Sequence, residues 1–194
     1  MSAGVEEGSP RIKDWIERGY SLNLGWLRMS AKLDHLKEIA KVAVDTKLRS
    51  LKLSEEEKLV EVMNSSFGWR RLELGALENW RVEDPSFTED WVQVAKVDGR
   101  IVSAVVARPD TESNKYLHLK RGALDPAATL PEFRSRHLAS ALTAQAMNLL
   151  FEKGMESVRH GTSELNIPSQ TLLRSLGSHV DNVRKIPRKK LKNG

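Results

Sequence analysis

The segment that most constrains the fold runs from Thr129 to Lys153 and reads TLPEFRSRHLASALTAQAMNLLFEK. Apolar residues recur in it at the spacing of one helix face, namely Leu138, Ala141, Leu142, Ala146 and Leu149. That spacing predicts a long helix with one apolar stripe against a core. Lys153 and Gly154 are typical of a helix C-terminus, a cation in the last turn followed by glycine.

The expected start of this helix carries Arg134, Arg136 and His137, with only Glu132 to offset their charge. A helix N-terminus already bears about half a positive charge, so cations there are unfavourable unless an anion joins them. Phosphate is the usual anion at such a place, because it accepts hydrogen bonds from the free N–H groups. A solvated arginine cluster, neutralised by water and salt, is the alternative interpretation.

The same segment resembles the coenzyme A loop of the GNAT N-acetyltransferases, in which Val-x-Pro precedes Gln/Arg-x-x-Gly-x-Gly/Ala. Pro131, Arg134 and Ala139 match the proline, the Gln/Arg and the last small residue, whereas Thr129 replaces valine and His137 replaces the middle glycine. Glycine there lets phosphate approach the backbone, so the His137 side chain must swing aside or contact the phosphate itself.

A later segment resembles a second pattern of this family, Asn-x-x-Ser/Ala followed by Leu-Tyr and Gly-Phe. The matching residues are Asn166, Ser169, Leu172 and Gly177. Leu173 stands where the family's usual proton donor, a tyrosine, is expected, and Ser178 replaces the phenylalanine. Two roles are possible for Asn166, a side-chain contact to the pantetheine arm and a helix cap.

The resemblance implies that acetyl-CoA is the acyl donor. The residues implied for binding it lie around the helix start and in the later segment: Thr129, Arg134, Ser135, Arg136, His137, Leu138, Ala139, Ser140 and Asn166.

Local patterns predict the remaining elements of the chain. Residues 1–45 are expected to form a helical N-terminal extension, with helices near 10–19 and 30–44, that lies over the main domain or serves as a lid or subunit contact. The expected elements of the main domain, residues 46–180, are a strand at 47–53, helices at 54–67 and 71–80, a hairpin at 92–107, strands at 115–123 and 157–162, and a helix near 166–177. Gly122 is expected at a bulge or a close backbone approach.

This order matches the GNAT fold, an α+β (α/β) architecture with a mixed, mostly antiparallel central sheet flanked by helices. The first helix of the main domain has a predicted capping box at Ser54 and Glu57. The hairpin turns at Asp98-Gly99, which is the two-residue type I′ signal.

Composition limits the alternatives. The chain has 194 residues and a net charge of +5, and six basic residues between Arg184 and Lys192 make residues 181–194 a basic tail. Such a tail can tether nucleic acid or remain solvated. The chain has no cysteine, which excludes thiolate metal sites, and its histidines show no ligand spacing, so no metal is expected. No signal peptide or membrane helix is visible, and we expect a cytoplasmic protein.

The resemblance implies an N-acetyltransferase in which a primary amine attacks the thioester directly, the acceptor being a small amine, a polyamine or a peptide N-terminus. His118, on the polar face of the strand predicted at 115–123, is the first candidate base, because imidazole titrates near neutrality. Glu164 is the second candidate, and Tyr116 is a candidate proton donor. For each of these three residues a purely structural role is the alternative. The sequence does not predict the oligomeric state. A non-catalytic acyl-CoA sensor and a basic nucleic-acid-binding protein are the competing functions.

Overall fold

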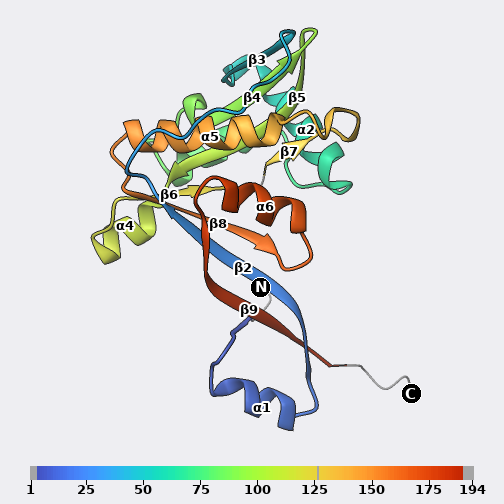
Figure 1. Cartoon of the computed structure of the whole chain (residues 1–194), viewed down its shortest axis with the longest axis vertical. Helices are drawn as coiled ribbons and strands as arrows, with labels where there is room; N and C mark the ends of the chain where they lie inside the picture. The colour runs from blue at the N-terminus through green and yellow to red at the C-terminus, as the bar shows by residue number, and fades with distance from the viewer. Residues whose placement is uncertain (1–3, 126, 190–194) are drawn as a thin grey trace. The chain divides into compact units, whose positions relative to one another are not determined.

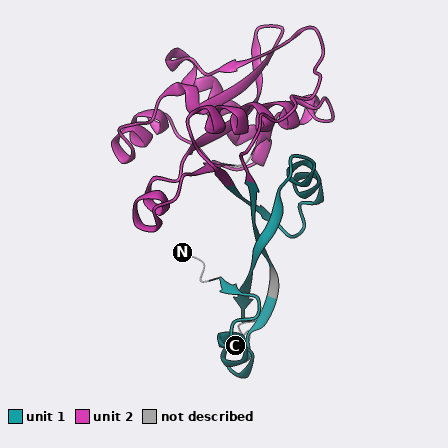
Figure 2. Cartoon of the chain, turned by 60° about the vertical axis from the view of Figure 1, so that its left-hand side comes forward, with its two compact units in different colours: residues 1–31, 159–194 teal, residues 32–158 magenta. Residues whose placement is uncertain are grey.

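The computed structural model describes residues 4–125 and 127–189. The chain forms two compact units, one of residues 32–158 and one of residues 1–31 together with 159–194 (Figure 2). The strand β8 (Ser157–Ser163) begins in the first of these units and ends in the second. No helix within the described residues has the length and apolarity that crossing a membrane requires.

The unit of residues 32–158 is a mostly antiparallel sheet covered by helices. Its strands are β3 (Thr46–Ser50), β4 (Val92–Val97), β5 (Arg100–Pro109), β6 (Arg121–Leu124) and the short β7 (Ala128–Thr129). Its helices are α2 (Glu56–Phe67), α3 (Ala76–Glu83), α4 (Thr111–Leu117) and α5 (Leu138–Glu152), with 3-10 turns at Leu53–Glu55, Glu89–Trp91 and Pro131–Phe133. The strand order is β6-β5-β4-β3, and β7 also pairs with β5. The predicted mixed α+β fold is confirmed.

The β4–β5 hairpin forms the centre of this unit, as predicted. Asp98 and Gly99 both have positive φ, 46° and 85°, which is the type I′ geometry that the Asp-Gly pair favours. β5 is buried on both faces because α5 and α2 both pack against it, α5 in front and α2 behind in Figure 1. Gly122 of β6 lies at a close approach, since a Cβ there would lie 2.6 Å from Leu150 Cδ1 of α5.

The start of α2 differs from the prediction. The box expected at Ser54 and Glu57 does not form, and α2 has no side-chain cap. Instead, the buried Glu55 pairs with both terminal nitrogens of Arg49, at 2.8 Å each, and accepts the Lys52 N–H at 3.1 Å. The Arg49 guanidinium is the main cause of the lowered pKa of Glu55. A partly buried ion pair between β3 and the 3-10 turn therefore replaces the predicted local cap.

The helix predicted at residues 30–44 is wrong. The chain there leaves the strand β2 (Ser21–Lys32) and continues without regular structure to Thr46. The Asn148 side chain of α5 fixes this segment, because it accepts the Lys37 N–H at 2.6 Å and donates to the Lys37 carbonyl oxygen at 2.9 Å. Leu36 and Val44, which the helical pattern placed on a buried stripe, are 55% and 104% exposed.

The second unit is built around β2. Its other elements are β1 (Val5–Glu6), the predicted short helix α1 (Arg11–Glu17), α6 (Ile167–Ser175) and β9 (His179–Arg188), and its strand order is β1-β9-β2-β8. Leu27, Met29 and Ala31 alternate with exposed residues along β2 and are buried, and Leu27 and Met29 pack with Leu173 of α6. The N-terminal segment is thus not wholly helical, since it supplies an inner strand of this sheet.

We predict that Gly25→Ala severely destabilises this unit. A Cβ at Gly25 would lie 1.9 Å from the backbone oxygen of Arg184 in the paired strand β9, whereas one at Gly4 would make an ordinary contact of 3.5 Å with Arg184 Cβ. Because a backbone atom cannot give way as a side chain does, we expect a loss of about 2 kcal/mol or more in unfolding free energy. Denaturant unfolding of both variants measures this, with Gly4→Ala as the control. Equal stability of the two variants contradicts the prediction.

Candidate functional site

The turn between β7 and α5 has an unusual backbone. Ser135 and His137, on either side of Arg136, have φ values of 60° and 59°, in the left-handed region. His137 is the N-cap of α5 but makes no side-chain capping hydrogen bond. The first helical bond of the cap runs from Ala141 N–H to His137 O, at 2.9 Å, so the N–H groups of residues 138–140 have no acceptor within the helix. These groups are available to an anion.

The cations of this turn are exposed and lack carboxylate partners. Arg134 donates from Nη2 to Ser66 O at 3.0 Å and from Nε to Thr129 O at 3.4 Å. The Arg136 guanidinium lies over the Phe133 ring, 5.0 Å from its centroid. Within residues 4–125 and 127–189, no carboxylate pairs with either arginine, and α5 has no acidic residue in its first turn. Glu132, expected to offset them, pairs with Arg100 at 3.2 Å.

The geometry resolves the difficulty that His137 posed in the sequence. Histidine, with asparagine and aspartate, is enriched among non-glycine residues with positive φ. At 59° the His137 backbone takes the conformation that glycine adopts readily, and its side chain is exposed. The turn therefore keeps the backbone conformation of a glycine with a side chain directed to solvent. We call residues 134–140 the anion cradle.

The anion cradle contains nearly all of the predicted donor-binding residues. Thr129 lies just before it in β7, where its hydroxyl is 2.7 Å from Ser103 Oγ. Asn166 belongs to the other unit, where it caps α6 by accepting the Ser169 N–H at 3.2 Å. The helix-cap interpretation of Asn166 is thus observed, and its contact to a pantetheine arm remains a prediction.

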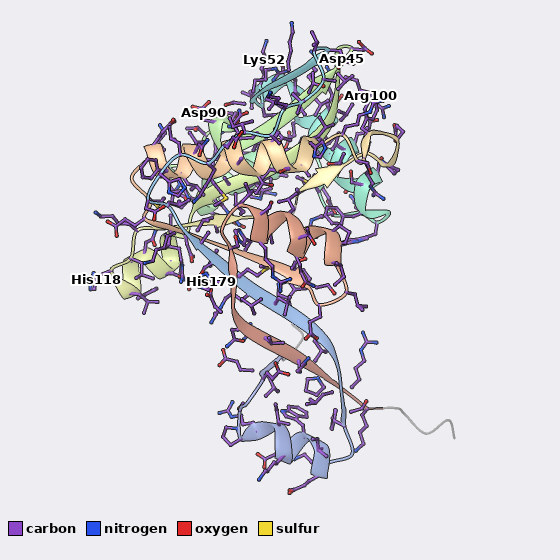
Figure 3. The ribbon with its side chains drawn as sticks, in the orientation of Figure 1. Asp45, Lys52, Asp90, Arg100, His118 and His179 are labelled. Atoms are coloured by element: carbon purple, nitrogen blue, oxygen red, sulfur yellow. The ribbon has the colours of Figure 1, made fainter. Side chains whose placement is uncertain are left out.

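His118 and Tyr116 do not lie on the strand for which they were predicted as catalytic candidates. The strand predicted at 115–123 is wrong in its first half, which forms α4, and His118 follows that helix with φ 51°. The Asn114 side chain causes this fold-back, because it accepts the Arg121 N–H at 2.9 Å and donates to the Arg121 oxygen at 2.8 Å. Tyr116 is 70% exposed, and Figure 3 shows His118 at the outer end of α4. Neither residue lies on the polar face of a strand.

Glu164 is held in a network within its own unit. Its Oε2 accepts the Gly25 N–H at 2.6 Å, and its Oε1 accepts from Lys185 Nζ at 2.7 Å. The bond from Lys185 and the bond from Gly25 lower the pKa of Glu164. A carboxylate stabilised in its ionised form accepts a proton poorly, so this geometry favours a structural role between β2 and β9.

His160 is a buried histidine that no sequence motif singled out. His160 lies on the buried face of β8, with Nε2 2.7 Å from Ser178 Oγ and Nδ1 without a partner among the described residues. Burial lowers the pKa of His160 to about 4, so the imidazole is neutral near pH 7. The alternation of Val158, His160 and Thr162 was the available signal of an inward-facing histidine.

The basic residues before the C-terminus are partly engaged. Lys185 pairs with Glu164 and, at 3.6 Å, with Glu7, and Lys189 lies over the Tyr20 ring at 5.3 Å. Lys190 and Lys192 of the predicted tail lie outside the described residues. No specific observation favours the nucleic-acid function.

Comparison with known proteins identifies the class to which this arrangement belongs. The model of the acetyltransferase (GNAT) family matches residues 56–177, which is more than half of the chain and includes the whole anion cradle. The chain belongs to this family. A search of curated proteins finds no match.

Solved structures share the fold at low sequence identity. A GCN5-related N-acetyltransferase from Sphaerobacter thermophilus is 18% identical with a TM-score of 0.79, over 98% of this chain and 59% of that one. The glucosamine N-acetyltransferase region of a fungal multi-domain β-N-acetylglucosaminidase is 13% identical with a TM-score of 0.70, over 96% and 24%. A GCN5-related N-acetyltransferase from Kribbella flavida is 16% identical with a TM-score of 0.64, over 100% and 68%. The chain thus spans about three fifths of the Sphaerobacter protein and a quarter of the fungal one.

We predict opposite effects for two substitutions at His137. His137→Gly should keep or raise stability and retain acetyl-CoA binding, because glycine adopts φ near 60° without steric cost. His137→Val should lose about 1–2 kcal/mol of unfolding free energy, because a β-branched residue is strained there. Denaturant unfolding and isothermal titration with acetyl-CoA measure both effects. His179→Val, in the strand β9, is the control. If the glycine variant is destabilised as much as the valine variant, the backbone explanation is wrong.

We also predict that Glu164→Gln destabilises the protein in a pH-dependent way. The folded-state pKa of Glu164 lies below the ordinary glutamate value of 4.5, so its contribution is fully present above that value and disappears as pH falls through the folded pKa. The loss of stability in the variant should therefore be greatest at about pH 7 and shrink as the pH falls from about 4.5 toward about 3. Urea unfolding across this range measures it, with Glu7→Gln as the control, since Glu7 is the exposed partner of Lys185. A pH-independent difference rules the mechanism out.

Proposed function

We propose that the chain is an acyl-CoA-dependent N-acetyltransferase whose anion cradle binds the diphosphate of acetyl-CoA. One observation carries the proposal: the start of α5 combines free N–H groups and a turn with two left-handed residues with two arginines that pair with no carboxylate among the described residues. Successive N–H groups in such a turn form a concave site for anions. The match to the acetyltransferase family supports the diphosphate of acetyl-CoA as that anion.

The acceptor in this proposal is a primary amine that attacks the thioester carbonyl directly. A bond forms between the amine nitrogen and the acyl carbon, and the bond from that carbon to sulfur breaks. The nitrogen loses one proton to solvent or a base, and coenzyme A leaves as thiolate or thiol. The main contribution of the protein is to hold the donor so that the reaction becomes effectively intramolecular.

Proton transfer is a smaller part of this proposal. Leu173, at the position of the family's usual acid, is 6% exposed and packs against Leu27 and Met29, so it is a core residue. Leaving thiolate is then protonated by solvent. We assign neither the base to His118 or Glu164 nor the proton donor to Tyr116, because the placement of each removes or weakens the argument for it.

A sensor that binds acyl-CoA without turnover is the second candidate. Buried Leu173 and the engaged Glu164 carboxylate favour it, since neither can serve in acid–base catalysis as placed. The two candidates share donor binding and differ only in whether acetyl-CoA is consumed.

We predict that acetyl-CoA binds and that Arg136→Ala weakens this binding about tenfold, the effect of losing one charge-assisted interaction with phosphate. Isothermal titration measures affinity, and thiol release over a panel of primary amines measures turnover. Lys153→Ala, an exposed cation just past the opposite end of α5, should bind like the wild type.

No detectable binding at millimolar acetyl-CoA refutes the proposal for both candidates. Binding without thiol release across a broad amine panel selects the sensor. Equal weakening by Arg136→Ala and Lys153→Ala refutes the placement of the diphosphate at the anion cradle.

A further inference from the structure

The loop after α2 carries an arginine whose guanidinium lies over two aromatic rings. The Arg71 guanidinium carbon lies 4.5 Å from the centroid of Phe67 and 5.6 Å from that of Trp69. The two rings meet edge to face, with centroids 6.4 Å apart. Within the described residues, no carboxylate pairs with this guanidinium. A cation–π contact with two rings restrains the guanidinium while its N–H groups can still donate to an anion.

The loop that presents Arg71 is fixed by hydrogen bonds. Asn64 Oδ1 accepts the backbone N–H groups of Arg71 and Leu72, at 2.6 and 2.9 Å, and Asn64 Nδ2 donates to Leu72 O at 3.0 Å. Gly68, with φ 71°, ends α2 and donates to Asn64 O at 2.9 Å. A ligand therefore meets a stacked arginine whose backbone is already positioned, which reduces the entropy lost on binding.

This loop is continuous with the anion cradle. Arg134 of the cradle donates to the backbone oxygen of Ser66, which directly precedes Phe67. Arg134 and Arg71 thus contact consecutive residues of α2, because Arg134 bonds to Ser66 and Arg71 lies over the Phe67 ring. Trp69 is 58% exposed, which is unusual for so large an apolar side chain on a fixed loop. The surface beside the cradle consequently offers an exposed indole and a second site for an anion.

Coenzyme A has groups that match this surface. Its diphosphate is joined through one ribose both to a flat adenine base and to a separate 3′-phosphate. An exposed indole suits the base, because base–aromatic stacking is favourable for any nucleobase. A stacked guanidinium suits a phosphate monoester, which accepts its hydrogen bonds in a planar pair.

We propose that Phe67, Trp69 and Arg71 bind the adenosine 3′-phosphate end of acyl-CoA, with Arg71 on the 3′-phosphate and Trp69 against the adenine. This inference rests on the proposed diphosphate site, and it adds a part of the donor that the anion cradle does not contact. It makes the protein selective for coenzyme A thioesters over those of dephospho-coenzyme A, which differ only in the 3′-phosphate.

The experiment is isothermal titration of wild type, Arg71→Ala and Arg70→Ala with acetyl-CoA and with acetyl-dephospho-CoA. Wild type should prefer acetyl-CoA about tenfold, as expected for one charge-assisted phosphate contact. Arg71→Ala should reduce that ratio to about one. Arg70→Ala should keep it, because Arg70 is the neighbouring exposed arginine and pairs instead with Glu73 at 3.1 Å. Trp69→Ala should weaken both ligands equally, since both carry adenine.

The outcomes separate this inference from the proposed function. Wild type that binds both ligands with equal affinity refutes the 3′-phosphate contact while leaving the donor site intact. A ratio unchanged in Arg71→Ala, or lost equally in Arg70→Ala, refutes the assignment to Arg71. Absence of acetyl-CoA binding refutes the proposed function and this inference together. The wild-type ratio needs no variant, so a variant that fails to fold does not prevent the test.

Discussion

The packing of α5 on the β4–β5 hairpin is the constraint on which the candidate site depends. Leu138, Leu142 and Leu150 of α5 are almost completely buried, so the helix is fixed from its first residue nearly to its last. Small residues at Ala141, Ala144 and Ala146, all fully buried, let the helix approach the sheet closely. The burial of these side chains stabilises the packed helix and so keeps its first turn in a fixed position on the sheet. An anion site at that start is rigid because of contacts made along the whole helix.

That rigidity allows two left-handed residues to persist in the turn before α5. A non-glycine residue in this conformation costs roughly 1–2 kcal/mol. Bonds from the Arg134 side chain to the backbone at Thr129 and Ser66 hold the turn on both sides. Strain of this kind survives only where the surrounding structure over-determines it, and it concentrates at binding sites. The conformation of Ser135 and His137 is therefore more informative about function than their side-chain chemistry is.

The parts of the fold that the sequence predicted correctly depend on local signals. The Asp98-Gly99 turn and the apolar spacing of α5 act over a few residues, and both are found as expected. β2 was missed because its neighbours in the sheet, β8 and β9, both lie far along the chain, so no local pattern specifies their pairing.

The candidate site, like the fold, has a part that local sequence signals predict and a part that depends on distant contacts. Its residues in the turn were predictable from a short motif, and the tolerance of histidine for positive φ was a usable signal for His137. The positions of the catalytic candidates could not be predicted in this way. Each candidate lies on a segment whose position is fixed by side chains elsewhere in the chain. Asn114 folds the segment of His118 into a helix, and Lys185 ties Glu164 to β9. The stack on Arg71 likewise needs Asn64 to fold the loop, which no local pattern specifies.

Direct acyl transfer makes donor binding the property that decides activity in such a protein. General acid–base catalysis contributes roughly 10²–10⁴-fold, whereas holding two reactants in place contributes effective molarities of about 10⁵–10⁸ M. A buried leucine in place of the proton donor therefore removes the smaller contribution. If the proposed donor site is correct, losing the conformation at Ser135 and His137 would remove the larger contribution, because the start of α5 would no longer hold the donor. An active enzyme is thus compatible with Leu173 in the core and incompatible with a disrupted anion cradle.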